Sequence, residues 1–265
     1  MEKIINFCPN GSETTKENSL APIFPNEVIE EVIDFYEKQL ITLVHIHARN
    51  KNGKPSSKVQ DFSPIIEGIR KYCPDLTICA SLSGRYFNTF EERSAVLDLK
   101  PDMGSLTMGS WNYKTGVNIN SPQMIVSLAE KMNKLGIVPE LECFDAGMLN
   151  YVNYLIKKKT LKSPNYINMI FGNLSNAQLN IDTVSDILNN KPENSIMCFG
   201  GIGGQQLEAN LTGIYKADGC RIGLEDNLYN LNNEKTTNFN LLKRIEVYSK
   251  GYIMKPKDFK QWLQS

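Results

Sequence analysis

Two histidines, the only ones among 265 residues, stand two positions apart in the run LVHIHAR. Residues at i and i+2 share one face of a β-strand and lie about 7 Å apart along it, so His45 and His47 could converge on one metal ion. A catalytic zinc site needs a third protein ligand and an open fourth position. Glu225, at the end of the run CRIGLE, is the best candidate. A pair of hydrogen-bonded core histidines is the structural alternative.

Other polar side chains recur with the same two-residue spacing near the ends of apolar runs. These sets are Thr77, Cys79 and Ser81; Ser105 and Thr107; Glu140 and Glu142; and Arg221, Gly223 and Glu225. The residues between them, such as Ile222 and Leu224, are apolar, which predicts a polar inner face and an apolar outer face. Alternatives remain open here: a structural ion pair for Glu142 and Arg221, small-residue filling for Ser81 and Thr107, and a turn cap for Asp226.

These residues need a scaffold that brings the ends of several strands together. Eight β-rich runs alternate with helical patterns, and the predicted strands are residues 4–8, 41–49, 76–83, 104–110, 138–144, 166–171, 195–201 and 220–225. Predicted helices include 26–39, 121–136 and 146–159, the second starting at Ser121-Pro122 and stopping at Gly136. Such alternation predicts a parallel sheet, and eight repeats favour one α/β domain over 1–265, a (β/α)8 TIM barrel with its site at the C-terminal strand ends. An open doubly wound sheet is the alternative.

The composition argues against several classes of function. Lys plus Arg number 29, as do Asp plus Glu, so no charge excess favours nucleic acid as a partner. No apolar run is long enough to span a bilayer, and the start MEKIINFC lacks a signal-peptide core. The six cysteines form no CxxC pair, which predicts free buried thiols in a cytoplasmic protein. The run GGIGG (200–204) lacks dinucleotide-site spacing and is interpreted first as a substrate loop or a packing feature.

Longer motifs resemble the β-keto acid cleavage enzyme family. They are GSETT (11–15), VHIHARNKNGKPS (44–56), ASLSG (80–84), EERSAVLDLKPDMGSLTMGSWN (91–112), VPELECFDAGM (138–148), GGIGGQQ (200–206) and CRIGLEDN (220–227). The resemblance implies a zinc-dependent (β/α)8 barrel, usually a homotetramer, which converts a β-keto acid and acetyl-CoA into acetoacetate and a new acyl-CoA.

The resemblance also implies roles for individual residues. It implies His45, His47 and Glu225 as zinc ligands, and Glu142, Arg221 and Asp226 as the catalytic acid–base group. Ser81 and Thr107 resemble contacts for the substrate carboxylate, and Glu13, in the loop after the first strand, resembles a further substrate contact.

Two departures from the family pattern bear on the cosubstrate. Asn50 follows Arg49 where the family has an acidic residue, and segment 171–178 (FGNLSNAQ) is shorter and poorer in glycine than the family's acyl-CoA loop. Lys16, Lys51, Lys54 and Lys114 could hold the CoA phosphates instead, or be solvated surface. A metal-dependent aldolase or lyase without CoA, and a non-enzymatic relative that keeps the pocket, are therefore the competing hypotheses.

Overall fold

The computed structural model describes residues 2–114, 116–249 and 251–265. Eight parallel strands close into a barrel, each hydrogen-bonded to the next in chain order, and β12 returns to β1. This confirms the barrel and excludes the open sheet. The barrel strands are β1 (Ile4–Phe7), β2 (Leu43–Ile46), β5 (Thr77–Ala80), β6 (Met103–Thr107), β9 (Val138–Cys143), β10 (Asn165–Phe171), β11 (Ser195–Gly201) and β12 (Gly219–Ile222).

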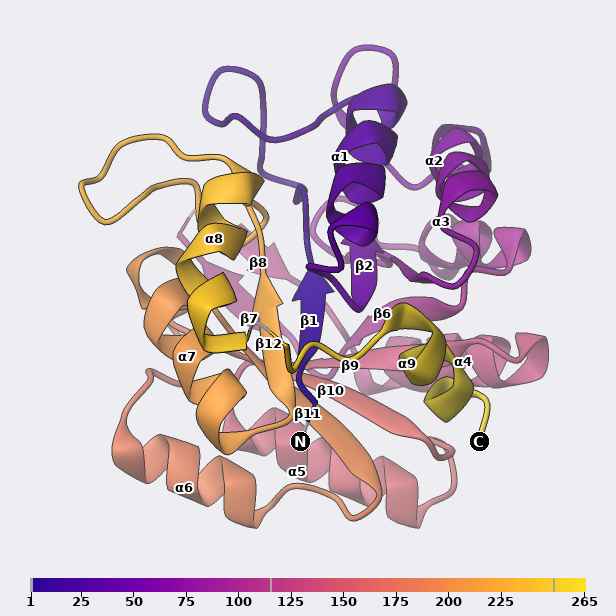
Figure 1. Cartoon of the computed structure of the whole chain (residues 1–265). Helices are drawn as coiled ribbons and strands as arrows, with labels where there is room; N and C mark the ends of the chain where they lie inside the picture. Colours follow the sequence, from indigo (N-terminus) through magenta and orange to yellow (C-terminus); the bar gives the residue numbers. More distant parts are fainter. Residues whose placement is uncertain (1, 115, 250) are drawn as a thin grey trace.

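Helices surround the barrel (Figure 1). They are α1 (Pro25–Glu37), α2 (Val59–Tyr72), α3 (Phe90–Ser94), α4 (Pro122–Leu135), α5 (Ala146–Lys157), α6 (Ile181–Asn189), α7 (Gln206–Lys216), α8 (Asn238–Ser249) and α9 (Pro256–Leu263), with 3-10 turns at Ala95–Leu99 and Gly203–Gln205. The start and stop signals predicted for the helix at 121–136 are confirmed in α4. At its start, the Ser121 hydroxyl accepts a hydrogen bond from the Met124 amide. Gly136 ends α4 in the left-handed region, at φ 71°.

Side chains alternate across the strands as predicted. Val44, Ile46 and Ile222 join the large apolar cluster between the strands and the helices. Inside the barrel, an apolar cluster fills the N-terminal half, and Phe259 and Leu263 of α9 belong to it. Most polar residues of the same inner face, Thr77 excepted, therefore lie in the C-terminal half, above an apolar floor.

Six of the predicted strands end earlier than expected, and three of these ends affect site residues. β2 stops at Ile46, β5 at Ala80 and β12 at Ile222, so His47, Ser81 and Glu225 lie beyond the strands. After β2 the chain turns into a short ribbon of β3 (Ala48–Arg49) and β4 (Pro55–Ser56), and after β6 into a hairpin of β7 (Trp111–Tyr113) and β8 (Gly116–Asn118). Strand alternation alone therefore does not place Glu225.

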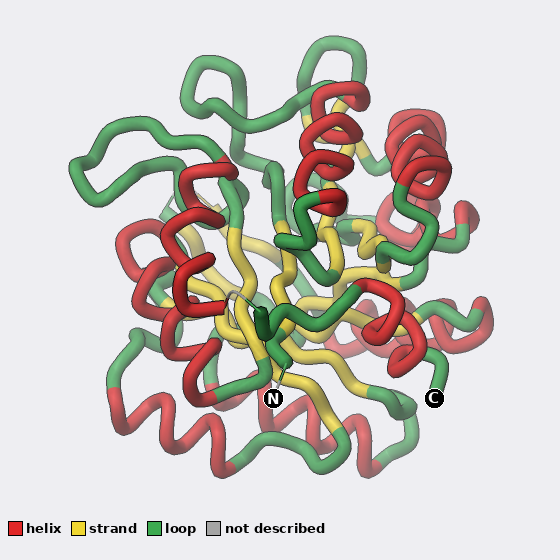
Figure 2. Tube along the Cα trace, viewed as in Figure 1, coloured by secondary structure: helices red, strands yellow, loops and turns green. Residues whose placement is uncertain are grey.

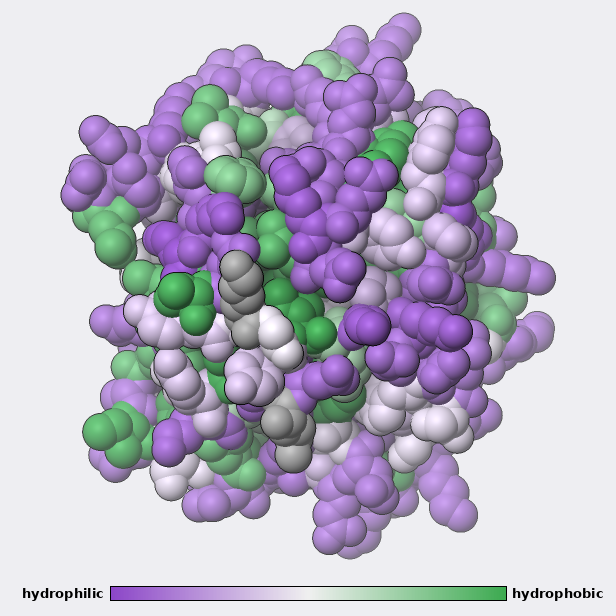
Figure 3. Space-filling model, viewed as in Figure 1, coloured by the Kyte–Doolittle hydropathy of each residue, from purple (hydrophilic) through white to green (hydrophobic). Residues whose placement is uncertain are grey.

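Long loops gather at the C-terminal end of the barrel, at the top of the view in Figure 2. The face shown in Figure 3 is mostly hydrophilic, with apolar side chains in separate patches. Within the described ranges, no helix is both long and apolar enough to cross a bilayer.

Helix α9 should contribute strongly to stability because it fills the barrel floor. Phe259 is fully buried, and its ring meets that of Tyr166 edge-on with centroids 5.5 Å apart. We expect Phe259→Ala to lower the free energy of unfolding by about 3–5 kcal/mol, as other buried Phe truncations do. Denaturant titration measures this, with Tyr252→Ala as the control on an exposed ring. Equal losses in the two variants would contradict the assigned packing.

Candidate metal centre and active site

Three potential metal ligands converge just above the apolar floor. His45 Nε2 and His47 Nε2 lie 3.3 Å apart, and His47 Nε2 lies 3.1 Å from Glu225 Oε1. Zinc–nitrogen bonds of about 2.0–2.1 Å at tetrahedral angles also separate two nitrogens by about 3.3 Å. Glu225 Oε2 is buried without a hydrogen-bond partner among the described residues, 3.7 Å from His45 Nε2. The spacing and the unpaired oxygen fit a divalent ion, and the three residues form a possible metal-binding group.

The surroundings of the two rings act on them in opposite directions. Burial lowers the pKa of His47 to about 4, which leaves a neutral imidazole with a free lone pair. Burial works in the same direction on His45, but the carboxylates of Glu140 and Glu225 outweigh it and raise the pKa of His45 to about 9. Two carboxylates around one ring thus favour a positive charge between them.

Glu140 is the functional residue whose role the sequence did not reveal. Its buried carboxylate accepts hydrogen bonds from Asn6 Nδ2 at 2.6 Å, Asn168 Nδ2 at 2.7 Å and Cys79 Sγ at 3.0 Å. Its Oε2 also lies 2.5 Å from His45 Nδ1. This contact fixes the His45 tautomer, so that Nε2 faces the metal position. The spacing with Glu142 placed Glu140 on the inner face, but its partners come from distant strands.

His45, Cys79 and Glu140 form a second possible metal-binding group. Burial raises the pKa of the Cys79 thiol well above its usual value, and the Glu140 carboxylate raises it further. Cys79 therefore remains a thiol that donates to Glu140, whereas a metal ligand must be a thiolate. We assign this group to the support of His45.

Arg221 holds three carboxylates together beside the ligand set. Its Nη1 lies 3.0 Å from Glu142 Oε1, its Nη2 2.7 Å from Glu225 Oε1, and its Nε 2.9 Å from Asp226 Oδ2. Burial raises the pKa of both Glu142 and Asp226, although Arg221 opposes the rise. Burial alone would lower the pKa of Arg221, but the carboxylates led by Asp226 raise it well above its usual value. The arginine is thus a fixed cation, and Glu142 and Asp226 are carboxyls whose pKa values burial holds above their usual values.

A glycine turn delivers Glu225 and Asp226 to this position. Gly223 has φ 154°, and a Cβ there would lie 1.9 Å from the Cys8 carbonyl oxygen, so only glycine fits. The Gly203 amide donates to the Asp226 carbonyl at 2.8 Å. Part of GGIGG thus acts as a support for the site, and Gly203 also lines the cavity.

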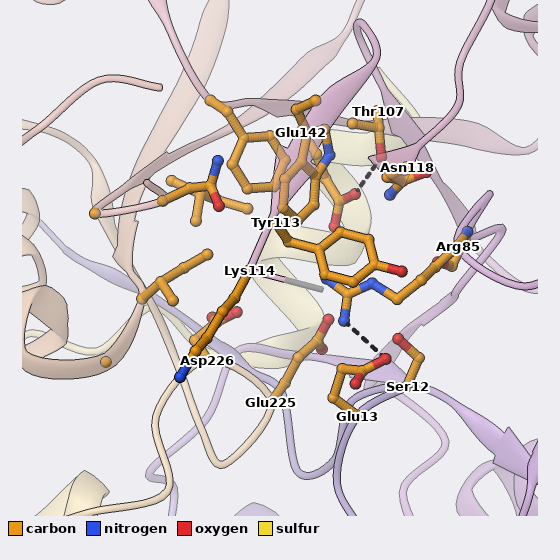
Figure 4. A pocket seen from close by; sticks show the side chains of 18 of the residues that line it. Ser12, Glu13, Arg85, Thr107, Tyr113, Lys114, Asn118, Glu142, Glu225 and Asp226 are labelled. Carbon is orange, nitrogen blue, oxygen red and sulfur yellow. Dashed lines mark hydrogen bonds and ion pairs between the residues drawn. The ribbon is translucent and has the colours of Figure 1, made fainter. Parts of the chain in front are cut away.

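A cavity of about 590 Å³ opens above these groups (Figure 4). Ser81 and Thr107 line it, and Thr107 Oγ1 donates to Glu142 Oε2 at 2.8 Å. Glu13 lies at the cavity wall with 48% of its side chain exposed, 3.3 Å from Arg85 Nη1. All the residues predicted for the site except His45 and Glu13 therefore meet around one cavity floor, with His45 just beneath it and Glu13 higher on the wall.

The remaining wall comes from residues outside the predicted set. Arg85 follows β5, and Trp111 and Tyr113 belong to the β7–β8 hairpin. The sequence signals for them were their places shortly after predicted strands and, for Trp111, the family motif at 91–112. Of the four lysines considered for CoA, Lys114 alone lines the cavity among the described residues, and Lys16 forms an ion pair with Glu27 at 2.8 Å.

Glu140 should control metal affinity without contacting the metal. Glu140→Gln keeps the size of the side chain but removes the charge that orients His45, so we expect zinc affinity to fall about 10–100-fold. Chelator competition measures this, with the exposed Glu193→Gln as control and circular dichroism to verify folding. Unchanged affinity in a folded Glu140→Gln protein would contradict this role.

Comparison with known proteins agrees with this architecture. Residues 2–262 match the family model described as beta-keto acid cleavage enzyme. A 3-keto-5-aminohexanoate cleavage enzyme of Acetoanaerobium sticklandii is 30% identical over 232 residues, covering 86% of this chain and 85% of that protein. A 3-oxoadipate:acetyl-CoA acetyltransferase of Cupriavidus necator is 31% identical over 229 residues, covering 85% and 80%.

Among solved structures, apo ObcA superposes with a TM-score of 0.72 at 16% identity, which shows a shared fold. The match covers 92% of this chain but 65% of the length of ObcA. The family match over nearly the whole chain carries more weight. The chain is an enzyme, and it belongs to the beta-keto acid cleavage enzyme family.

Proposed function

We propose that this enzyme is zinc-dependent and converts a β-keto acid and acetyl-CoA into acetoacetate and a new acyl-CoA. One observation supports this proposal most strongly. The possible metal ligands His45, His47 and Glu225 lie beside the carboxyl groups that contact Arg221, at the base of one cavity. The names of two relatives that include acetyl-CoA, the 3-oxoadipate and the 3-dehydrocarnitine transferases, support the cosubstrate.

Each group has a distinct task in this proposal. His45, His47 and Glu225 would hold the ion, and zinc supplies a Lewis acid that makes the carbon next to the keto group more acidic. Asp226 and Glu142 receive and return the proton, and burial raises the pKa of each above its usual value, which makes it a better proton acceptor. Arg221 keeps these carboxyls in place. Ser81 and Thr107 hold the substrate carboxylate beside them, and Glu13 contacts the substrate higher on the wall.

The cosubstrate must reach this floor from the loops. Gly172, Asn173 and Leu174 of the loop after β10 line the cavity. That loop is fixed by side-chain hydrogen bonds: Asn173 Nδ2 donates to the Asn112 carbonyl at 2.9 Å, and Asn176 Nδ2 to Asp145 Oδ2 at 2.7 Å. Because segment 171–178 contains neither lysine nor arginine, we expect acetyl-CoA to be bound weakly. The homotetramer and the cytoplasmic location stay predictions.

An acetoacetate assay with acetyl-CoA and a panel of β-keto acids tests the function. We expect acetoacetate to form only when both substrates are present, with a high KM for acetyl-CoA that rises with salt because exposed charges are screened. The zinc-free protein serves as the control. Turnover of a β-keto acid without CoA, unchanged when acetyl-CoA is added, would instead identify a CoA-independent lyase.

Asp226 should serve chemistry more than stability. We expect Asp226→Asn to lower kcat by orders of magnitude, because the amide cannot accept the proton, while zinc content changes little. Steady-state kinetics and metal analysis measure the two effects, with the exposed Asp182→Asn as control. A variant that loses its fold yet keeps activity per folded molecule would assign Asp226 a structural role.

A further inference from the structure

Arg85 occupies a defined position on the wall of the cavity. Its guanidinium carbon lies 4.1 Å from the ring centroid of Tyr113 and 5.5 Å from that of Trp111. Its side chain is only 15% exposed, although it stands in a loop. Stacking on aromatic rings restricts a guanidinium that would otherwise be flexible, so Arg85 is prepared for binding before a ligand arrives.

Most of the hydrogen-bonding capacity of Arg85 is unused. A guanidinium has five N–H donors. Within the described ranges, the only ion pair of Arg85 is between Nη1 and Glu13 Oε1 at 3.3 Å. Glu13 is about half exposed, and ion pairs with an exposed partner contribute little to stability, so the pair can open for a better partner.

Above the floor, Arg85 and the exposed Lys114 are the cations that line the cavity among the described residues, and of the two Arg85 is the one held against aromatic rings. Arg221 is already engaged by Glu142, Glu225 and Asp226. Glu13, the carboxylate nearest to Arg85, also accepts a hydrogen bond from the Tyr86 hydroxyl. Desolvation and this bond raise the pKa of Tyr86 to about 12, so its hydroxyl stays a donor to Glu13. Glu13 Oε1 thus already has two donors, the Tyr86 hydroxyl and Arg85 Nη1, before a substrate enters.

We propose that Arg85 is a specificity-determining residue that binds a second carboxylate, at the distal end of the β-keto acid. The substrate class is then a β-keto dicarboxylic acid. The reacting end lies at the floor beside Thr107 and Glu142, and the distal carboxylate meets the free edge of the Arg85 guanidinium, which matches carboxylate geometry. This inference rests on the proposed function for the identity of the reacting end.

Three β-keto acids of equal chain length test the proposal, with a carboxylate, a methyl or an ammonium group at the distal end. We expect kcat/KM with acetyl-CoA to be highest for the dicarboxylate. In Arg85→Gln, the ratio of kcat/KM between the dicarboxylate and the methyl substrate should fall about tenfold or more, the effect of one lost charge-assisted hydrogen bond. Arg85→Lys should restore part of that ratio.

Arg70→Gln is the matched control, because it removes the same charge from an exposed arginine of α2. In Arg70→Gln, the ratio of kcat/KM between the dicarboxylate and the methyl substrate should equal that of the wild type. The proposal would be overturned if Arg85→Gln lowered kcat/KM equally for all three substrates. It would also be overturned if the wild-type enzyme had its highest kcat/KM with the ammonium substrate.

A binding measurement separates this inference from the function itself. Calorimetry of the zinc-loaded protein without acetyl-CoA compares glutarate with butyrate. Tighter binding of glutarate that is lost in Arg85→Gln supports the distal subsite even if no acetoacetate forms in the assay. Equal binding of the two acids would overturn the subsite even if the reaction proceeds.

Discussion

Three carboxylates surround a single guanidinium in the upper interior of the barrel, and a fourth lies close by. Arg221 contacts Glu142, Glu225 and Asp226 directly, and Glu140 lies below them against His45. Burying this much negative charge is costly unless each oxygen is paired. The neighbouring polar side chains, Asn6, Asn168 and Thr107, supply donors to these carboxylates. The remaining deficit of positive charge, together with the unpaired Glu225 oxygen, explains why the same place suits a divalent ion.

The sequence predicted the part of this arrangement that strand geometry controls. Arg221, Glu142 and Thr107 lie within strands, where a period of two decides which face a side chain takes, and neighbouring strands bring Thr107 and Glu142 level. Glu225 lies past the end of β12, and its position depends on the Gly223 turn against Cys8. A turn held by contacts with the first strand cannot be derived from local spacing. The resemblance of CRIGLEDN to a family motif supplied what periodicity could not.

Contacts between segments that are separate in the sequence also limited what could be predicted. Glu140 acquires its role from Asn6 of β1, far away in the sequence, and from Asn168 of the neighbouring strand β10. Arg85 acquires its role from the aromatic rings of a hairpin that composition does not signal. Barrel enzymes commonly keep their chemistry on the strands and vary the loops, so substrate choice is the property least accessible to strand patterns.

Helix α9 has a consequence for how the molecule is made. The floor of the barrel combines Ile4 of the first strand with Phe259 and Leu263 of the last helix. Ile4 can meet Phe259 and Leu263 only after residues 259–263 have been synthesised, so the apolar interior stays incomplete until then. Contacts between such distant positions form slowly, because a long loop must close first. During that interval the apolar interior at the N-terminal end of the barrel is exposed to solvent. Molecular chaperones bind exposed apolar surface of this kind.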